Sequence, residues 1–381
     1  MTLRAMSDRW LPVVSLVIPC RNEADTIPKV LDSLVQQDYP AHLIELIIVD
    51  GMSSDGTLAA VEQFLSSRQP GFRVHILQNL DRITPKGLNM GIRAATGDVV
   101  FTLGAHTCYS SNYVSGALAT MARYSADAVG SMAVTLPGAN TLVARAISLV
   151  LSSRLGVGGS RMRLTRPAEA APEPADTASC PAYRREVFER IGLFDENLIR
   201  NQDIEFNTRL RRAGLRLLLD PGIKSFYTAR ATIAGLCRYA FANGFWSVTC
   251  LRSAHRRGSP LLNPGIRPRH LVPGFAAASG LLLTVGSLFS FIPAILLSAL
   301  VTVYLGLVVT SSLQLIRRSI VNQTRPVSRL KLFATICLLF PVLHSSYGIG
   351  SLRALFSRCM LLSYRRRPGR MPVIGSETNV F

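Results

Sequence analysis

Paired cysteines, acidic residues and nucleic-acid-binding motifs are all scarce in this 381-residue sequence. Its seven cysteines are odd in number and scattered, with no CxxC pair, so they indicate reduced thiols facing a cytosolic compartment and argue against a zinc site. Only 23 acidic residues face 42 lysines and arginines, which leaves a formal net charge of +19. That excess favours anionic lipid or a phosphorylated substrate, whereas the lack of a basic motif with interleaved aromatics argues against nucleic acid.

Charged side chains are missing altogether from residues 271–316. A helix needs about 20 apolar residues to cross a bilayer, so this stretch predicts two transmembrane helices, at about 272–291 and 294–316. Basic residues follow immediately, and they indicate positive-inside anchoring at the cytosolic face. They are Arg317, Arg318, Arg325, Arg329 and Lys331.

A third apolar segment, residues 332–352, is interrupted by His344, two serines and two glycines. A complete third span would export the basic tail at 353–381, against the positive-inside rule. We therefore expect a re-entrant or interfacial helix, with a full crossing as the alternative. The sequence predicts a multi-pass protein of the inner (cytoplasmic) membrane whose N-terminal domain lies in the cytosol.

Residues 1–235 have the pattern of an α/β domain. Apolar runs alternate with helical patterns at a spacing of about 25 to 30 residues, which predicts βαβ units and a mostly parallel, Rossmann-like sheet. A Pro- and Ala-rich segment at 165–178 has no periodicity and indicates a mobile surface loop. Residues 236–270 are expected to form interfacial linker helices before the membrane region at 271–352.

Polar turns follow the predicted strands along one edge of the sheet. Glu23, Asp50, Asp55 and the Gly104 to His106 tripeptide each come soon after an apolar run. Parallel sheets bind ligands at the carboxyl ends of their strands, so these turns are candidate ligand-binding residues. An Asx turn or a helix cap explains Asp55 equally well, because Thr57 follows it.

Eight short segments between residues 13 and 250 stand in a characteristic order and spacing: VSLVIPCRNEADTI, IIVDGMSSDGT, PKGLNMGIRAATGD, LGAH, RLGVGGSRMR, DTASCPAYRREVFERIGLFDE, NQDIEFNTRLRRAG and RYAFANGFW. This set resembles the inverting, nucleotide-sugar-dependent family 2 glycosyltransferases, whose catalytic domain has the GT-A fold. The resemblance is closest to their membrane-attached branch, which includes enzymes of exopolysaccharide synthesis. It implies a GT-A catalytic domain followed by C-terminal transmembrane helices.

The resemblance assigns roles only where residues match. It implies that Asp203 is the general base that deprotonates the acceptor hydroxyl, with Gln202 and Trp246 on the acceptor side. An alternative explanation for Asp203 is a helix N-cap, a position that aspartate favours. The processive polysaccharide synthases of the family usually carry a QxxRW motif. That motif is absent from RYAFANGFW, which favours addition of single sugars. Donor-nucleotide binding is implied for Pro19, Asn22, Glu23, Asp50, Asp55, Lys86 and Asn89.

Two positions depart from the family pattern. Gly104 stands where the family has a metal-binding aspartate, with His106 two residues later, and Gln202 replaces a glutamate. Three readings stay open: metal-independent catalysis in which Arg200 and Arg161 hold the diphosphate, a Mg²⁺ or Mn²⁺ ion held weakly by His106 and the nucleotide, or an inactive site. Since Mg²⁺ is often bound by only one or two carboxylates plus phosphates, the missing aspartate weakens the metal reading without removing it.

The sequence thus predicts a hexosyltransferase that moves a sugar from a nucleotide diphosphate donor, a UDP-sugar, to a lipid-linked or glycan acceptor. The reaction would occur at the cytosolic face of the membrane, with membrane lipid as a partner, during exopolysaccharide or other envelope glycan synthesis. Gly104 and Gln202 favour an alternative, a catalytically inactive family member that acts as a membrane scaffold or partner subunit. A third reading is sugar transfer to a polyprenyl phosphate.

Overall fold

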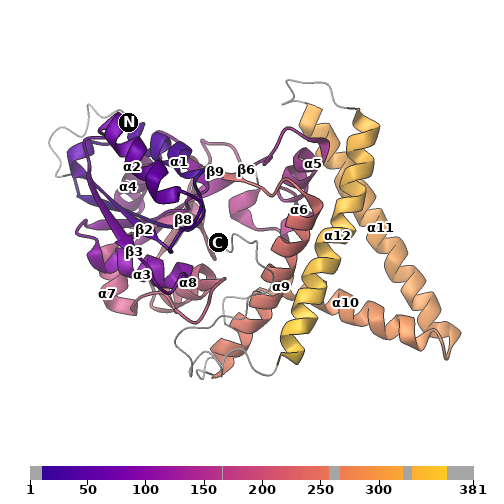
Figure 1. Cartoon of the computed structure of the whole chain (residues 1–381). Helices are drawn as coiled ribbons and strands as arrows, with labels where there is room; N and C mark the ends of the chain where they lie inside the picture. The colour runs from indigo at the N-terminus through magenta and orange to yellow at the C-terminus, as the bar shows by residue number, and fades with distance from the viewer. Residues whose placement is uncertain (1–10, 165, 257–266, 321–327, 358–381) are drawn as a thin grey trace.

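The computed structural model describes residues 11–164, 166–256, 267–320 and 328–357. It contains an α/β domain joined to a group of long helices (Figure 1). The domain is built on a nine-stranded sheet in the order β3-β2-β1-β4-β8-β6-β9-β5, with β7 paired to β9. The strands are β1 (Val14–Cys20), β2 (Ile44–Asp50), β3 (Arg73–Gln78), β4 (Val99–Thr102), β5 (Thr107–Tyr109), β6 (Ala128–Leu136), β7 (Glu173–Pro174), β8 (Ser179–Arg184) and β9 (Leu217–Thr228).

The sheet is mixed, although the prediction of parallel βαβ units is confirmed for its N-terminal half. β1 pairs in parallel with β2 and β4, and β2 pairs in parallel with β3. β8 runs antiparallel to both β4 and β6, and β5 and β7 run antiparallel to β9. The sequence pattern did not reveal this reversal because burial on both faces gives an apolar run whatever the direction of the strand.

Helices cover both faces of the sheet. One core combines the sheet with α1, α2 and α4, and a second combines it with α3, α7 and α8. Two further short helices, α5 and α6, lie toward the long helices (Figure 1). The domain's helices are α1 (Ile27–Val35), η2 (Ala41–Leu43), α2 (Thr57–Arg68), α3 (Thr84–Ala94), α4 (Tyr113–Tyr124), α5 (Leu142–Val150), α6 (Arg154–Val157), η3 (Arg161–Arg163), α7 (Arg185–Ile191) and α8 (Gln202–Arg212).

Four long helices follow: α9 (Ile233–Arg256), α10 (Pro268–Gly286), α11 (Phe291–Ile320) and α12 (Arg329–Phe356). α9 and α12 run side by side, whereas α10 and α11 form a V that projects away from the α/β domain (Figure 1). Glycines allow the close contact between α9 and α12. A Cβ atom added at Gly244 would lie 2.0 Å from the Tyr347 carbonyl oxygen, and one at Gly350 would lie 2.1 Å from that of Phe241.

Two of the described helices are long and apolar enough to cross a membrane, Phe291–Arg318 within α11 and Arg329–Phe356 within α12. The span expected at 272–291 corresponds to α10, which is not one of them, since Arg269 and His270 lie in its first turn. In the most apolar stretch of α11 only 6 % of the residues are buried, against 33 % in α12. The spans expected at 272–291 and 294–316 and the interfacial placement of 332–352 stay predictions.

Two predicted segments are only partly described. The basic tail at 353–381 is described only to residue 357, and the predicted linker at 236–270 lacks residues 257–266. The rest of that linker is helical, in α9 and at the start of α10. Within the described part of the predicted loop, residues 166–178, β7 pairs with β9 and Glu173 contacts Arg161 and Arg166.

Glu45 is a buried carboxylate in β2 that ties together the start of the sheet. It is 1 % exposed and accepts hydrogen bonds from the Ser15 hydroxyl (2.5 Å) and from the amide (2.8 Å) and hydroxyl (3.1 Å) of Thr96. Burial by itself would raise the pKa of Glu45, but these hydrogen bonds outweigh it and hold the pKa below its ordinary value. The folded domain therefore favours the ionised carboxylate.

We expect Glu45→Gln to destabilise the domain by about 1.5 to 3 kcal/mol at pH 7, the range for hydrogen bonds to a charged group. Because folding lowers this pKa, the contribution is present above the unfolded pKa of about 4.3 and is lost as pH falls through the folded value. Thermal denaturation in detergent should therefore show a Tm difference from wild type that shrinks between pH 7 and about pH 3. Glu62→Gln, at an exposed position on α2, is the control. A Tm difference independent of pH would contradict the prediction.

Candidate active site

A cavity of about 400 Å³ lies where the carboxyl ends of β1 and β4 face the first turn of α8. Its far wall comes from the long helices, through Tyr239 and Asn243 of α9 and His270 of α10. The fold thus brings together six of the predicted site residues from distant parts of the chain. They are Pro19, Glu23, Gly104, His106, Gln202 and Asp203.

The loops after β1 and β2 are joined by hydrogen bonds beside this cavity. The Asn22 side-chain oxygen accepts from the Ser54 amide (2.9 Å), and the Asn22 amide donates to the Ser53 hydroxyl (2.9 Å). Asp55 accepts from the amides of Ala24 (3.1 Å) and Thr57 (3.0 Å). The bond to Ala24 links the two loops, and the bond to Thr57 forms an Asx turn. Neither Asn22 nor Asp55 lines the cavity.

Three other predicted donor-site residues also lie outside the cavity lining. Asp50 is 1 % exposed, and its carboxylate accepts from the Ser53 amide (3.0 Å). Lys86 pairs with Asp81 (2.7 Å). The Asn89 amide group clamps the 193–197 loop, because it donates to the Phe194 carbonyl oxygen (2.9 Å) and accepts from the Phe194 amide (3.0 Å). Their contact with a nucleotide stays a prediction.

Gly104 occupies the strand end where the family has its metal-binding aspartate. Its amide donates to the buried Tyr109 hydroxyl (2.7 Å), which fixes the backbone at this point. A Cβ atom at position 104 would come within 3.2 Å of the Thr107 hydroxyl oxygen. A larger residue would therefore need the Thr107 side chain to shift by a few tenths of an ångström.

The residues present do not fit the metal site that the family pattern implies. Mg²⁺ and Mn²⁺ prefer several oxygen ligands, yet the described part of the chain contains no group of three or more His, Cys, Asp or Glu side chains that could hold a metal ion. Glu23 and His106 are bonded to each other through Oε1 and Nδ1 (3.2 Å), and Glu23 also accepts from the Thr26 hydroxyl. At most this pair could touch a cation carried by a bound diphosphate.

Asp203, the second residue of α8, points its carboxylate into the cavity while it also contacts the helix end. It accepts hydrogen bonds from its own amide, from the Ile204 amide and from the Thr177 hydroxyl. Burial raises the pKa of Asp203, and it outweighs these hydrogen bonds and the positive charge of Arg163. A carboxylate with a raised pKa is a stronger proton acceptor once it is ionised.

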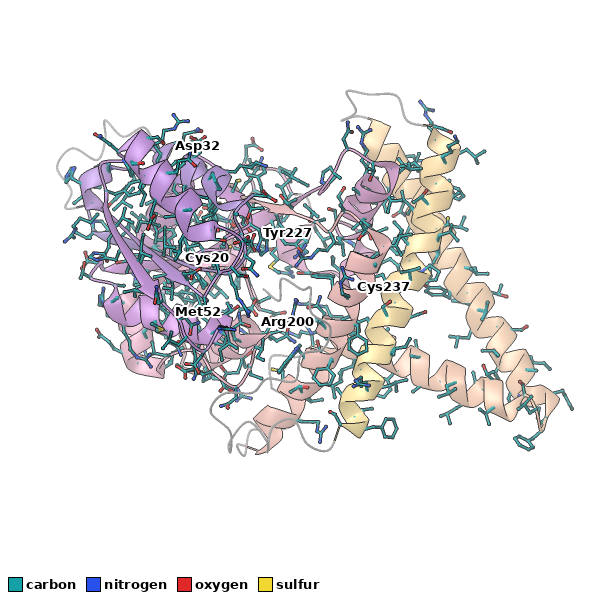
Figure 2. All side chains as sticks on the ribbon, viewed as in Figure 1. Cys20, Asp32, Met52, Arg200, Tyr227 and Cys237 are labelled. Carbon is teal, nitrogen blue, oxygen red and sulfur yellow. The ribbon has the colours of Figure 1, made fainter. Side chains whose placement is uncertain are left out.

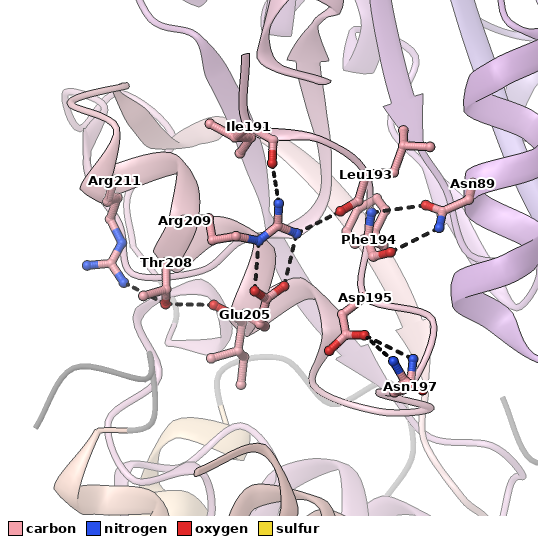
Figure 3. A network of polar contacts seen from close by, with 11 residues as sticks. Asn89, Ile191, Leu193, Phe194, Asp195, Asn197, Glu205, Thr208, Arg209 and Arg211 are labelled. Carbon is pink, nitrogen blue, oxygen red and sulfur yellow. Dashed lines mark hydrogen bonds and ion pairs between the residues drawn. The ribbon is translucent and has the colours of Figure 1, made fainter. Parts of the chain in front are cut away.

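An ion pair on α8 ties this helix to the segment that follows α7 (Figure 3). Arg209 forms two bonds to the Glu205 carboxylate, Nε to Oε1 (2.7 Å) and Nη2 to Oε2 (3.0 Å). The same guanidinium donates to the carbonyl oxygens of Ile191 and Leu193. Glu205 is thus occupied by a structural contact, and Asp203 is the carboxylate that α8 presents to the cavity.

Sequence reasoning missed Arg163 and assigned Arg161 instead. Arg161 is exposed and pairs with Glu173 (3.2 Å), outside the cavity, whereas Arg163 lines it. The Arg163 guanidinium lies 4.8 Å from the centre of the Tyr227 ring, which in turn contacts His106 edge-on at 5.6 Å. Arg200 also lines the cavity, and Figure 2 places Arg200 and Tyr227 on the side that faces α9. Nothing in the spacing of RLGVGGSRMR distinguishes Arg163 from Arg161.

The start of α8 is also connected to the long helices. Asn201, with its φ of 63°, precedes the helix, and its side-chain amide donates to the Ser247 hydroxyl of α9 (3.4 Å). Ser247 is bonded in turn to the Tyr347 hydroxyl of α12 (2.8 Å). Trp246, the neighbour of Ser247, contacts Phe245 and does not line the cavity. Its predicted place beside the acceptor stays a prediction.

Comparison with known proteins agrees with this architecture. Residues 15–192 match the model of the Glycosyl transferase family 2 domain. The succinoglycan biosynthesis protein ExoA of Rhizobium meliloti (strain 1021) is 31 % identical to this chain over 235 residues, which make up 60 % of this chain and 67 % of ExoA. The chain belongs to the family 2 glycosyltransferases.

Two archaeal proteins extend the comparison. The dolichyl N-acetyl-alpha-D-glucosaminyl phosphate 3-beta-D-2,3-diacetamido-2,3-dideoxy-beta-D-glucuronosyltransferase of Methanococcus voltae is 26 % identical over 235 residues, which are 61 % of this chain and 71 % of that protein. The mannosyltransferase PcManGT from Pyrobaculum calidifontis, solved with GDP-Man and Mn²⁺, superposes with a TM-score of 0.57 at 17 % identity and covers 92 % of this chain and 89 % of its own. At that identity the likeness shows the fold alone, and the fold is GT-A.

Proposed function

We propose that this protein transfers a hexose, with inversion, from a UDP-sugar to a lipid-linked acceptor at the cytosolic face of the membrane. One observation carries the proposal: Asp203 lines the same cavity as the strand end at Gly104 to His106. Asp203 suits the role of general base, and the strand end at Gly104 to His106 suits the diphosphate of the donor, because ligands of such sheets bind at the carboxyl ends of the strands. Membership of family 2 supplies the reaction class.

The reaction needs one base and one leaving group. The acceptor hydroxyl oxygen attacks the anomeric carbon from the side opposite the diphosphate, and a new C–O bond forms as the bond from that carbon to the diphosphate oxygen breaks. The hydroxyl proton passes to the Asp203 carboxylate, and the bonding electron pair leaves with UDP, which gains one negative charge. Direct displacement of this kind inverts the anomeric configuration.

A lipid-linked acceptor is supported by the wall of the cavity. Tyr239 and Asn243 of α9 and His270 of α10 close the site on the side of the long helices, so an acceptor would enter between the catalytic domain and the membrane region. The Methanococcus voltae relative is named for transfer to a dolichyl-linked sugar phosphate. The similarity to ExoA favours exopolysaccharide or related envelope glycan synthesis as the setting.

We infer that α12 lies along the membrane surface while the V of α10 and α11 enters the bilayer. The apex of this V is apolar and exposed at Leu288 (78 %), Phe289 (84 %) and Phe291 (74 %). α12 instead packs beside α9, and one third of its most apolar stretch is buried. This arrangement keeps the basic residues at both ends of α12 on the side of the catalytic domain, as the positive-inside rule requires.

Cysteine labelling tests that topology. In a variant whose native cysteines are replaced by serine, Arg329→Cys and Ser357→Cys should both react with a membrane-impermeant maleimide from the cytosolic side only, because both ends of α12 lie on one face. Asp25→Cys, exposed in the catalytic domain, is the control for that side. Labelling of positions 329 and 357 from opposite sides of the membrane would mean that α12 crosses it.

The role of Asp203 is tested by Asp203→Asn in the full-length protein with membrane lipid extract. We expect UDP release to fall by about 10² to 10⁴, the contribution of a general base, while the Tm and UDP binding are retained. Asp32→Asn, on the surface of α1, should match wild type. If wild-type protein releases no more UDP than Asp203→Asn with any common UDP-sugar, with or without Mn²⁺, the protein is the inactive scaffold that Gly104 and Gln202 favour.

The pH dependence of the reaction should follow the pKa of Asp203. The base must be ionised, so kcat/KM should fall as pH drops through its raised pKa. The Thr177 hydroxyl stabilises the carboxylate, so Thr177→Val should raise the pKa further and move the acid limb to higher pH. Thr208→Val removes a hydroxyl that bonds only the Ile204 carbonyl oxygen and the Arg211 guanidinium, and it should leave the limb unchanged. An acid limb that stays put or moves to lower pH in Thr177→Val would contradict Asp203 as the base.

A further inference from the structure

The negative charge of the leaving diphosphate must be balanced within this cavity. UDP gains a negative charge as the sugar departs, and sugar transfer needs positive charge positioned at that place. The chain has Gly104 and Gln202 where the family has carboxylates, and the described side chains do not form the metal site that those carboxylates support. The compensating charge must therefore be sought among other residues that line the cavity.

Arg163 is connected through Tyr227 to the strand end where the diphosphate is expected. Its guanidinium stacks over the Tyr227 ring at 4.8 Å, and the edge of the same ring contacts His106 at 5.6 Å. Tyr227 therefore contacts both Arg163 and the turn formed by Gly104, Ala105 and His106. The charge of Arg163 also acts on Asp203, and both residues line the cavity.

Arg200 approaches the same place from the loop before α8. It lines the cavity two residues before Gln202, and its charge, like that of Arg163, acts on the Tyr227 hydroxyl. Burial lowers the pKa of Arg200, which means that its guanidinium is largely removed from water. A guanidinium in such surroundings interacts more strongly with a phosphate than one in bulk water does.

Neither guanidinium is neutralised by a carboxylate. In the part of the chain that the structure describes, no Asp or Glu oxygen lies within ion-pair distance of Arg163 or Arg200. Among the described residues, the Arg163 guanidinium makes one hydrogen bond, a long one to the Thr135 hydroxyl (3.5 Å). Other arginines nearby differ in this respect, since Arg161 and Arg166 contact Glu173 and Arg267 contacts Asp176. Two guanidinium groups without an ion-pair partner among the described residues thus line the cavity.

We propose that Arg163 and Arg200 bind the diphosphate of the nucleotide donor and stabilise the departing UDP in place of a divalent cation. The proposal rests on the proposed function, because it assigns the leaving-group side of the same reaction. Arginine suits this task since its planar fork donates two parallel hydrogen bonds to phosphate oxygens. Glycine at position 104 and glutamine at 202 then keep additional negative charge out of a site whose cations are arginines.

The test measures UDP and uridine binding to the full-length protein in detergent by calorimetry, in EDTA and then in Mg²⁺ or Mn²⁺. Wild-type affinity for UDP should agree within about twofold in all three buffers. Arg163→Gln and Arg200→Gln should each weaken UDP binding about tenfold or more, the loss expected for one charge-assisted contact of about 1.4 kcal/mol or more, while uridine binding is unchanged. Arg163→Lys should recover part of the loss.

Arg161→Gln is the matched control, because it removes a neighbouring arginine that pairs with Glu173 outside the cavity. It should bind UDP as wild type does. UDP binding that requires a divalent cation, or that survives in both Arg163→Gln and Arg200→Gln, would overturn the proposal and favour a cation held by His106 and the nucleotide. Gly104→Asp adds a second readout, since a carboxylate beside the arginines should weaken UDP binding in EDTA.

A further arm separates the donor from the acceptor as the source of phosphate. Farnesyl phosphate, a short lipid phosphate, should bind equally well to wild type and to the two glutamine variants. If the variants lose farnesyl phosphate and keep UDP, the arginines belong to the acceptor and the proposal fails. A different result would separate this proposal from the proposed function. If UDP binds without a cation and needs both arginines, but no lipid extract supports turnover, the arginine site is confirmed and the proposed transferase activity is wrong.

Discussion

The bond between Arg209 and Glu205 is the interaction on which the geometry of the site depends. It occupies the only other carboxylate of α8 and ties the helix to the carbonyl oxygens of Ile191 and Leu193. Asn89 then fastens the following loop to α3 (Figure 3). With the outer face of α8 fixed in this way, its first turn projects into the cavity, and one carboxylate, Asp203, faces the strand ends.

The site is completed by helices that the catalytic fold does not itself contain. α9 and α10 supply one wall, and the hydrogen bonds from Asn201 through Ser247 to Tyr347 connect the start of α8 to both α9 and α12. The close contact at Gly244 holds α9 against α12. The turn before the proposed base is therefore hydrogen-bonded to α9 and, through Ser247, to α12.

Local patterns predicted the strands and the position of Gly104 well. Apolar runs located β1, β2 and β4, because these strands are buried on both faces, and the sequence pattern also located β3, whose residues are exposed or half-buried. The order of short motifs identified the family. The antiparallel course of β8 was not predictable, since strand direction depends on which distant strand it pairs with. Arg161 and Arg163 show the same limit. They are two residues apart in one segment, yet Arg161 forms an ion pair with Glu173 whereas Arg163 stacks over the ring of Tyr227.

The sequence by itself determined the reaction class, the apolar C-terminal region and the two positions where the usual acids are replaced. These are properties of residue type and order, which survive without any knowledge of packing. Only the tertiary structure decided that Asn89 and Asp55 bond to the protein's own backbone and that Arg163 and Arg200 converge on one cavity. Charge compensation at a site depends on distances between residues remote in sequence, and those distances are set by the packing of α8 against the sheet and of α9 against α12.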